Sequence, residues 1–240
     1  MKVLILKLES TMLSFGDVAV DEFRPTARHP FKSMVVGMLS NALGYKRTDW
    51  SKIEDLQSGV KIASRIDREG NLMTDYQTAL TNPNNPKEPT FINRESWTTK
   101  AVLNRTVKND ENAIQICRDY LIDASITVAI ASSNEEVLSK CISAVKRPAR
   151  PLFIGRKTCI PTRPIFEAEA NADSLFEVLS TYPTTDGRME ASVRTEGNEN
   201  HLYEEVCREF LIRDEKDWAN GFHAYERPVA EGIVKIKEVA

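Results

Sequence analysis

Two apolar segments, each followed directly by a helical pattern, constrain the fold of this chain most strongly. The first segment, residues 2–9 (KVLILKLE), has apolar side chains at successive positions, which is typical of a central strand buried on both faces. Residues 30–43 then change to helical spacing, with Pro30 in the first turn and Gly44 as the stop. This pattern predicts a helix that packs on a sheet.

The same strand-then-helix unit recurs in the second half of the chain. Residues 124–131 (ASITVAIA) have the β-branched density of a buried strand. Ser133 and Glu136 then form a capping box, in which the serine caps the helix and the glutamate reaches back to a free N–H group. Apolar positions continue at helical spacing to Val145, so we expect the helix to end before Pro148.

Further strands are predicted at residues 61–68, 72–80 and 165–170. The resulting order of strand, helix, strand, strand, arm, strand, helix, strand predicts an α+β fold with a ferredoxin-like (RRM-like) core. The arm is predicted because a polar, proline- and asparagine-rich excursion begins at residue 81, and long insertions of this kind are often functional.

Residues 171–240 differ in composition from the rest of the chain. Only short strands are predicted there, such as residues 208–213 and 232–237, and they are separated by acidic turns. We therefore divide the chain into a core at residues 1–170, with a thumb arm at about 80–116, and a small acidic, β-rich accessory region at residues 171–240.

Positive and negative charges are segregated along the chain. The net charge is only −3, yet residues 140–164 carry seven cations and no acid, and residues 24–47 carry five cations and no acid. Residues 165–240 carry 17 acids against 8 cations. This segregation indicates one face for a polyanion, although both basic stretches are also compatible with plain solvated surface.

The more informative basic stretch is residues 146–164, KRPARPLFIGRKTCIPTRP. Gly155 allows the backbone to turn so that successive N–H groups approach a phosphate, and Arg156 and Lys157 add charge. The alternative is an ordinary turn with solvated cations. The spacing is not that of a P-loop.

The second basic stretch, residues 23–33, leads into the first predicted helix. Arg24, Arg28, His29 and Lys32 lie where that helix exposes free N–H groups, and Ser33 adds a hydroxyl donor, so the sequence predicts an anion site there. Alternatively, the two arginines pair with neighbouring acids of the same loop.

Several classes of function are disfavoured by the sequence. No apolar run is long enough to span a membrane and the first residues do not resemble a signal peptide, so we expect a cytoplasmic protein. The four cysteines are too widely spaced for a zinc ribbon. No hydrolase or metal-binding motif is present, and we expect no catalytic residue, metal or cofactor.

Four blocks of sequence resemble one family in the same order and spacing. They are RPTxRxPxKSxxxGxLxxALG at residues 24–44, DYQT at 75–78, RDYLIDASITVA at 118–129 and RPxxPLFIGRKTC at 147–159. The chain is similar to the CasD family of the RAMP superfamily, the subunits of type I-E CRISPR Cascade surveillance complexes that hold the 5′ handle of the guide RNA (crRNA).

The resemblance implies a noncatalytic crRNA-binding subunit that hooks the 5′ handle and caps the filament of backbone subunits in antiviral defence. It also implies contacts with the CasC backbone subunit through the thumb and with the large CasA subunit. The RNA-binding residues that it implies are Arg24, Arg28, Lys32, Ser33, Tyr76, Thr78, Arg118, Arg147, Gly155, Arg156 and Lys157.

Two other functions remain open at this stage. Relatives in type I-C systems are metal-independent endoribonucleases that process CRISPR repeat RNA with a tyrosine and an adjacent lysine and histidine. Tyr45 lies near the tyrosine position, but the chain contains no Lys-His pair to supply a general base. The third hypothesis is an unrelated α+β domain that binds another protein.

Overall fold

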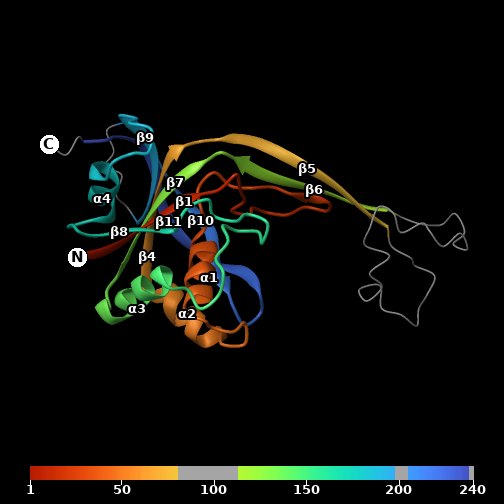
Figure 1. Ribbon diagram of the computed structural model, residues 1–240, viewed down its shortest axis with the longest axis horizontal. Coiled ribbons are helices and arrows are strands. Elements are labelled where there is room, and N and C mark those ends of the chain that lie inside the picture. The colour runs from red at the N-terminus through yellow and green to blue at the C-terminus, as the bar shows by residue number, and fades with distance from the viewer. Residues whose placement is uncertain (81–112, 198–204, 238–240) are drawn as a thin grey trace, which may run out of the picture.

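The computed structural model describes residues 1–80, 113–197 and 205–237, and these segments form an α+β fold with four helices and two sheets (Figure 1). Within these segments, no helix combines the length and apolar character needed to cross a membrane.

The larger sheet has seven strands in the order β10-β11-β9-β4-β7-β1-β8, and each neighbouring pair is antiparallel. The strands are β1 (Lys2–Glu9), β4 (Val60–Arg68), β7 (Ser125–Ser132), β8 (Phe166–Asn171), β9 (Glu190–Glu196), β10 (Glu205–Asp217) and β11 (Phe222–Lys235). The predictions of β1, β4, β7 and β8 are confirmed to within one or two residues at each end.

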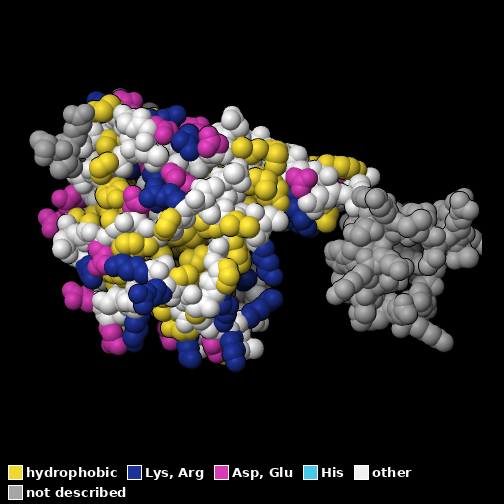
Figure 2. Space-filling model, viewed as in Figure 1, with side chains coloured by type: hydrophobic (Ala, Val, Ile, Leu, Met, Phe, Trp, Pro, Cys, Tyr) yellow, Lys and Arg dark blue, Asp and Glu magenta, His cyan; other side chains and the backbone are white. Residues whose placement is uncertain are grey.

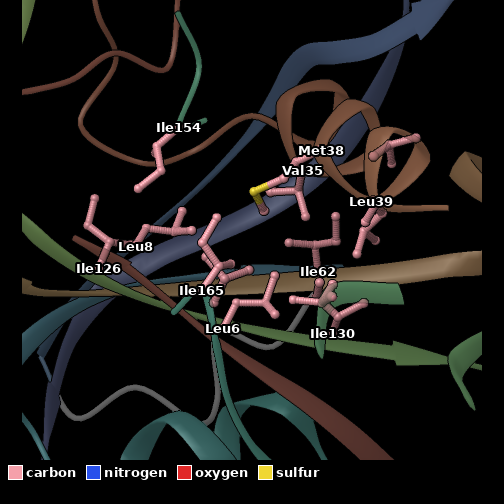
Figure 3. Packing of buried hydrophobic residues seen from close by; sticks show 14 of the residues in the cluster. Leu6, Leu8, Val35, Met38, Leu39, Ile62, Ile126, Ile130, Ile154 and Ile165 are labelled. Atoms are coloured by element: carbon pink, nitrogen blue, oxygen red, sulfur yellow. The ribbon is translucent and has the colours of Figure 1, made fainter. Parts of the chain in front are cut away.

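Helices cover both faces of this sheet: α1 (Lys32–Ala42), α2 (Trp50–Gly59) and α3 (Glu135–Lys146) on one face, and the short α4 (Leu175–Thr181) on the other. In Figure 3, Val35, Met38 and Leu39 of α1 point toward strand residues such as Leu6 and Ile130. Strand β1 is buried from both sides, as its sequence predicted.

The start of α3 differs from the predicted capping box. Asn134, and not Ser133, caps the helix, because its side-chain oxygen accepts hydrogen bonds from the backbone N–H groups of Glu136 (3.0 Å) and Val137 (3.4 Å). At the end of α1, Gly44 has φ +79°, so its prediction as the C-terminal glycine is confirmed.

The smaller sheet is built around β6 (Ala113–Ile122), which pairs along its full length with β5 (Asn71–Leu80). Its other edge pairs with two short strands, β2 (Met12–Leu13) and β3 (Phe23–Arg24). The β5–β6 hairpin extends away from the body of the molecule (Figure 1). Most of the predicted thumb arm, residues 81–112, lies outside the described residues, and β6 itself was not predicted.

Strands β9, β10 and β11 hydrogen-bond into the seven-stranded sheet through the β9–β4 pair. The short strands predicted at 208–213 and 232–237 are therefore parts of a long hairpin that continues the main sheet. The division of the chain at residue 170 does not coincide with a break in this sheet, and it stays a prediction about independent folding.

Candidate nucleic-acid interface

The basic loop between α3 and β8 folds back over the end of α1. The backbone N–H of Ala149 donates to Ala42 O (2.9 Å), and the guanidinium of Arg150 donates to Gly44 O (2.6 Å) and Tyr45 O (2.9 Å). A cation on carbonyls at and just beyond a helix C-terminus satisfies free acceptors and complements the helix dipole. Arg150 thus fixes the loop to the body through neutral partners, which do not cancel its charge.

The turn at residues 154–159 is closed by two backbone hydrogen bonds, Ile154 N to Cys159 O (2.8 Å) and Cys159 N to Arg156 O (2.9 Å). Gly155 has φ +87°, and a Cβ placed there would lie 1.5 Å from the carbonyl oxygen of Ser14. Only glycine fits this position, because the backbone of Ser14 already occupies the space of a side chain.

The same turn presents unpaired backbone donors. Within the described part of the chain, the N–H groups of Lys157 and Thr158 have no hydrogen-bond acceptor, whereas the N–H of Arg156 donates to the Cys159 sulfur. Successive free N–H groups at a tight turn form a concave anion-binding feature. The immediate requirement for glycine in this turn comes from Ser14, and the phosphate contact expected from the sequence stays a prediction.

Arg156 holds the turn against the smaller sheet. Its guanidinium donates to Asp119 O in β6 and to Arg24 O in β3, both at 2.8 Å, and lies over the ring of Tyr120 at 4.7 Å. These are neutral partners, so the positive charge of Arg156 remains uncompensated. Sequence reasoning missed Tyr120, although its spacing of two from Arg118 would place both on one face of a strand.

Arg24 and Arg118 are directly opposite each other in the parallel β3–β6 pair. The guanidinium of Arg24 donates to Phe23 O (2.9 Å) and to Asp21 O, and that of Arg118 donates to Gln77 Oε1 (2.7 Å). Arg24 therefore contacts the backbone of Asp21 and does not form the ion pair that the alternative interpretation expected. Both arginines have neutral hydrogen-bond partners, and Asp75, directly opposite Arg118 in the β5–β6 pair, accepts a hydrogen bond from the same Gln77 side chain.

We call Arg24, Arg118, Arg156 and Lys157, with the N–H groups of the turn, the cationic turn surface. Among the described residues, no carboxylate lies within 4.0 Å of any of these four side chains. Arg147, exposed at the end of α3, is also without such a partner in these segments. Figure 2 shows Lys and Arg side chains along the edge of the body that lies below the β5–β6 hairpin.

A cavity of about 250 Å³ adjoins this surface, between α1 and the turn. Its lining residues are Ser33, Met34, Gly37, Met38, Asn41, Phe153 and Gly155. Two predicted RNA-binding residues, Ser33 and Gly155, thus meet at one cavity although they are far apart in the sequence. The apolar walls suit a flat ring, and the Ser33 hydroxyl, 3.0 Å from His223 Nε2, supplies a polar group.

Tyr76 and Thr78 lie on the opposite face of the β5–β6 hairpin from Arg118. The register pairs Tyr76 with Cys117 and Asp75 with Arg118, and residues opposite each other in an antiparallel pair share a face. Both Tyr76 and Thr78 are exposed. The structure therefore does not bring these two predicted residues together with the cationic turn surface.

The start of α1 is neutralised by the chain itself. Asp214 of β10 accepts a hydrogen bond from the Lys32 backbone N–H (2.9 Å), and the Lys32 ammonium contacts Glu196 (2.9 Å) and Glu215 (2.7 Å). The Lys32 side chain is only 4% exposed. These carboxylates occupy the anion position predicted here, so a contact of Lys32 with RNA gains no support from the arrangement.

Two further residues of this predicted site, Arg28 and His29, are also engaged. Arg28 forms an exposed ion pair with Glu69 at 2.6 Å. His29 is buried between the hydroxyls of Ser64 (2.8 Å) and Ser192 (3.2 Å), and burial, followed by the positive charge of Arg194, lowers its pKa to about 3. His29 is therefore neutral near pH 7, contrary to its place in the predicted cationic cluster.

Tyr45 and His29 are separated by the length of α1. His29 precedes this 11-residue helix and Tyr45 follows it, and a helix of that length is about 16 Å long. The two side chains are thus not arranged to act on one phosphate. Among the described residues, no group of His, Cys, Asp and Glu side chains has the geometry of a metal site.

Comparisons with known proteins identify the class of this chain. A family model described as CRISPR-associated protein (Cas_Cas5) matches residues 3–226, and the chain therefore belongs to this family. It is 30% identical over 214 residues to the CRISPR system Cascade subunit CasD of Escherichia coli (strain K12), covering 88% of this chain and 87% of that protein. The resemblance to CasD found in the sequence is confirmed.

Two solved structures have a similar fold. One, described as the crystal structure of a Cas protein, has a TM-score of 0.65 and 22% identity, covering 98% of this chain and 95% of the other. The second belongs to a CRISPR RNA-guided surveillance complex, with a TM-score of 0.67 and 20% identity, covering 98% and 90% of the two chains. At these identities the likeness establishes the α+β fold alone.

Proposed function

We propose that this protein is a noncatalytic crRNA-binding subunit of a type I-E CRISPR Cascade surveillance complex, in which it hooks the 5′ handle of the guide RNA. The carrying observation is the cationic turn surface, where four cations from three separate segments, none in an ion pair within the described residues, converge beside free N–H groups. The similarity to CasD supports this function.

The proposal includes a ferredoxin-like core. The strand order β8-β1-β7-β4, with α1 between β1 and β4 and α3 between β7 and β8, supports this assignment. We further propose that the β5–β6 hairpin forms the base of a thumb at about residues 80–116. The thumb would contact a CasC-like backbone subunit and so cap its filament, while another surface meets a CasA-like large subunit in the cytoplasm.

Different groups of the protein recognise the backbone and the bases of the RNA. Lys157 and the turn N–H groups bind phosphate oxygens, which fixes the position of the strand but does not distinguish sequences. An unpaired base then enters the cavity beside Phe153, where stacking on an aromatic ring contributes about 1–3 kcal/mol. Single-stranded RNA is the nucleic acid that offers such free bases.

A noncatalytic role is favoured over the metal-independent endoribonuclease alternative by the positions of the candidate acid and base groups. His29 is buried, neutral and hydrogen-bonded at both ring nitrogens, and α1 separates it from Tyr45. General acid–base cleavage needs both groups within hydrogen-bond reach of the reacting phosphate.

The test measures binding of the full chain to a labelled single-stranded RNA with a repeat-derived 5′ end, across a series of salt concentrations. Lys157→Gln and Arg118→Gln each remove one proposed phosphate contact. Each substitution should therefore weaken binding about 3- to 10-fold and reduce the slope of log K against log salt by about 0.7. The matched control is Lys140→Gln, since Lys140 is exposed on α3 and paired with Glu136 at 2.7 Å.

Equal affinity of the wild type and the Lys157→Gln/Arg118→Gln double variant would contradict the proposed surface. Moving the repeat-derived segment to the 3′ end of the RNA tests the handle assignment, and we expect weaker binding. Incubation in EDTA tests the alternative function, because a discrete cleavage product would identify an endoribonuclease.

A further inference from the structure

The face of the smaller sheet that carries Tyr76 has exposed aromatic side chains on neighbouring strands. Cys117 of β6 is paired with Tyr76 of β5 on one side and with Phe23 of β3 on the other, so the three residues form a row across the sheet. Tyr76 is 58% exposed, Phe23 is 57% exposed, and the exposed Leu72 lies on the same face of β5. We call Phe23, Leu72, Tyr76 and Cys117 the aromatic sheet face.

The composition of this face is that of a contact surface. Phe23 and Tyr76 belong to the strands on either side of β6, so their Cα atoms are about 10 Å apart. Contiguous exposed apolar side chains on a soluble protein mark interaction sites, and aromatic residues are enriched in the centres of protein interfaces. Figure 2 shows hydrophobic side chains at the surface of the β5–β6 hairpin.

The aromatic sheet face differs in charge from the cationic turn surface on the other side of the same sheet. Within the described residues of β2, β3, β5 and β6, the register places Arg24 and Arg118 on the opposite face and leaves Asp119 as the one charged side chain here. Asp119 accepts a hydrogen bond from the Thr74 hydroxyl (2.6 Å) and forms no ion pair with a described residue. Its carboxylate therefore keeps its negative charge.

This charge disfavours RNA as the ligand of the aromatic sheet face. Proteins that stack bases on aromatic side chains also supply cations along the path of the phosphate backbone. The described residues of this face offer a carboxylate and no Lys or Arg, so a phosphate chain that crossed it would be repelled.

A second copy of this chain is disfavoured for a related reason. A twofold interface uses the same patch on both subunits, so the two Asp119 carboxylates would approach each other without a cation on this face. A different protein that presents apolar side chains beside a lysine or arginine complements both the aromatic row and the carboxylate.

We propose that the aromatic sheet face docks another protein subunit of the same complex, through a segment whose apolar side chains cover Phe23 and Tyr76 and whose lysine or arginine pairs with Asp119. The inference rests on the proposed function, because that function supplies the complex. It assigns to Tyr76 a contact with protein in place of the RNA contact that the sequence resemblance implies.

The first test measures the exposure of the Cys117 thiol, which lies between the two aromatic residues. The full chain is treated with N-ethylmaleimide alone and in the complex assembled by co-expression with the other subunits of its host, and the modified residues are identified by peptide mass spectrometry. We expect Cys117 to react about 10-fold more slowly in the complex. Cys141 and Cys159 are internal references, because both are buried and burial raises their pKa values.

The second test measures how much of the chain is retained in the purified complex after a substitution. Tyr76→Lys removes an aromatic contact and places a cation against the cationic segment, so retention should fall about 10-fold, whereas Tyr76→Phe should be retained like the wild type. Asp119→Asn keeps an acceptor for Thr74 but removes the charge, and should lower retention about 3-fold. The matched control is Leu211→Lys, because Leu211 is 65% exposed on β10, outside this sheet.

Equal modification of Cys117 in both states, or equal retention of Tyr76→Lys and Leu211→Lys, would overturn the inference, and the proposed function would stand if Lys157→Gln still weakens RNA binding. Protection of Cys117 by the labelled RNA alone would identify an RNA surface, and a dimer of the isolated chain that Tyr76→Lys dissociates would identify a second copy. Either result would also overturn the inference. A chain that neither binds the RNA nor enters the complex would instead contradict the proposed function.

Discussion

Two regions of this molecule have the sequence signature of an anion site, and the fold treats them in opposite ways. At the start of α1, Asp214, Glu196 and Glu215 contact the free N–H and the ammonium of Lys32, which leaves that site internally neutralised. At the cationic turn surface, described arginines contact only carbonyl, amide and aromatic groups. Only the second region keeps its charge for an external partner.

This difference shows that the density of cations along the sequence does not determine which of them can bind an external anion. The acids that neutralise the start of α1 are 164 to 183 positions away from Lys32 in the sequence. Asp214 and Glu215 reach it only because β10 and β11 extend the main sheet. The acidic C-terminal region thus has a structural role: it uses carboxylates to fix the first helix on the sheet.

The largest expected effect comes from removing the carboxylate at the start of α1. Asp214→Ala leaves Arg227, which is 8% exposed, and the N–H of Lys32 without their buried partner. Breaking such a buried pair should lower the free energy of unfolding by about 3–5 kcal/mol, measured by urea denaturation. Glu226→Gln is the control, because its exposed pair with Arg213 should contribute less than about 1 kcal/mol. Similar effects of the two substitutions would mean that the neutralised site does not stabilise the fold.

A smaller effect is expected from Gly155→Ala at the cationic turn surface. The positive φ and the overlap with Ser14 O should together lower the free energy of unfolding by about 2–4 kcal/mol. Gly16→Ala is the matched control, because Gly16 has φ +71° and nothing within 4 Å of the added Cβ, which leaves a conformational cost of about 1–2 kcal/mol. Equal thermal shifts for both variants would contradict the requirement for close packing against Ser14.

Much of the central fold was predictable because its signals are local. The apolar run of residues 2–9 is enough to predict β1, and Gly44 is enough to predict the end of α1. Strand β6 was missed since its polar residues adjoin the proline-rich excursion, and its pairing with β5 depends on the hairpin. The hairpin of β10 and β11 was predicted only in fragments, because register shifts interrupt the alternation of apolar and polar positions.

The candidate site was predictable in its residue types but not in their partners. The sequence indicated that Gly155 makes a turn and that Arg156 and Lys157 carry charge. It did not indicate that Arg156 would bind carbonyls of β3 and β6, because those partners depend on the tertiary fold. Tyr76 and Arg118 were grouped together since both belong to matching sequence blocks, whereas the alternation of strand side chains places them on opposite faces.

The smallest effect concerns the protonation of His29. A neutral His29 adds no charge to the region before α1, whereas a protonated His29 would add one positive charge there. The folded pKa of about 3 lies below the ordinary value of 6.5, because burial, and then Arg194, disfavour protonation. Between these values the unfolded chain binds a proton that the folded chain does not, so stability falls as pH decreases from about 7.5. At pH 5.5 the loss from His29 should be about 1.4 kcal/mol.

His29→Gln keeps a side chain that can hydrogen-bond to Ser64 and Ser192 but removes the titration. The free energy of unfolding should be measured for both proteins between pH 5.5 and 8, above the range where carboxylates titrate. The difference in free energy of unfolding between the wild type and His29→Gln should change by about 1.4 kcal/mol across this range. Comparing the two proteins cancels the contribution of His223, whose pKa is also lowered by burial. A difference that does not depend on pH would show that His29 becomes protonated in the folded protein. The region before α1 would then gain positive charge at mildly acid pH, and the contrast with the cationic turn surface would narrow.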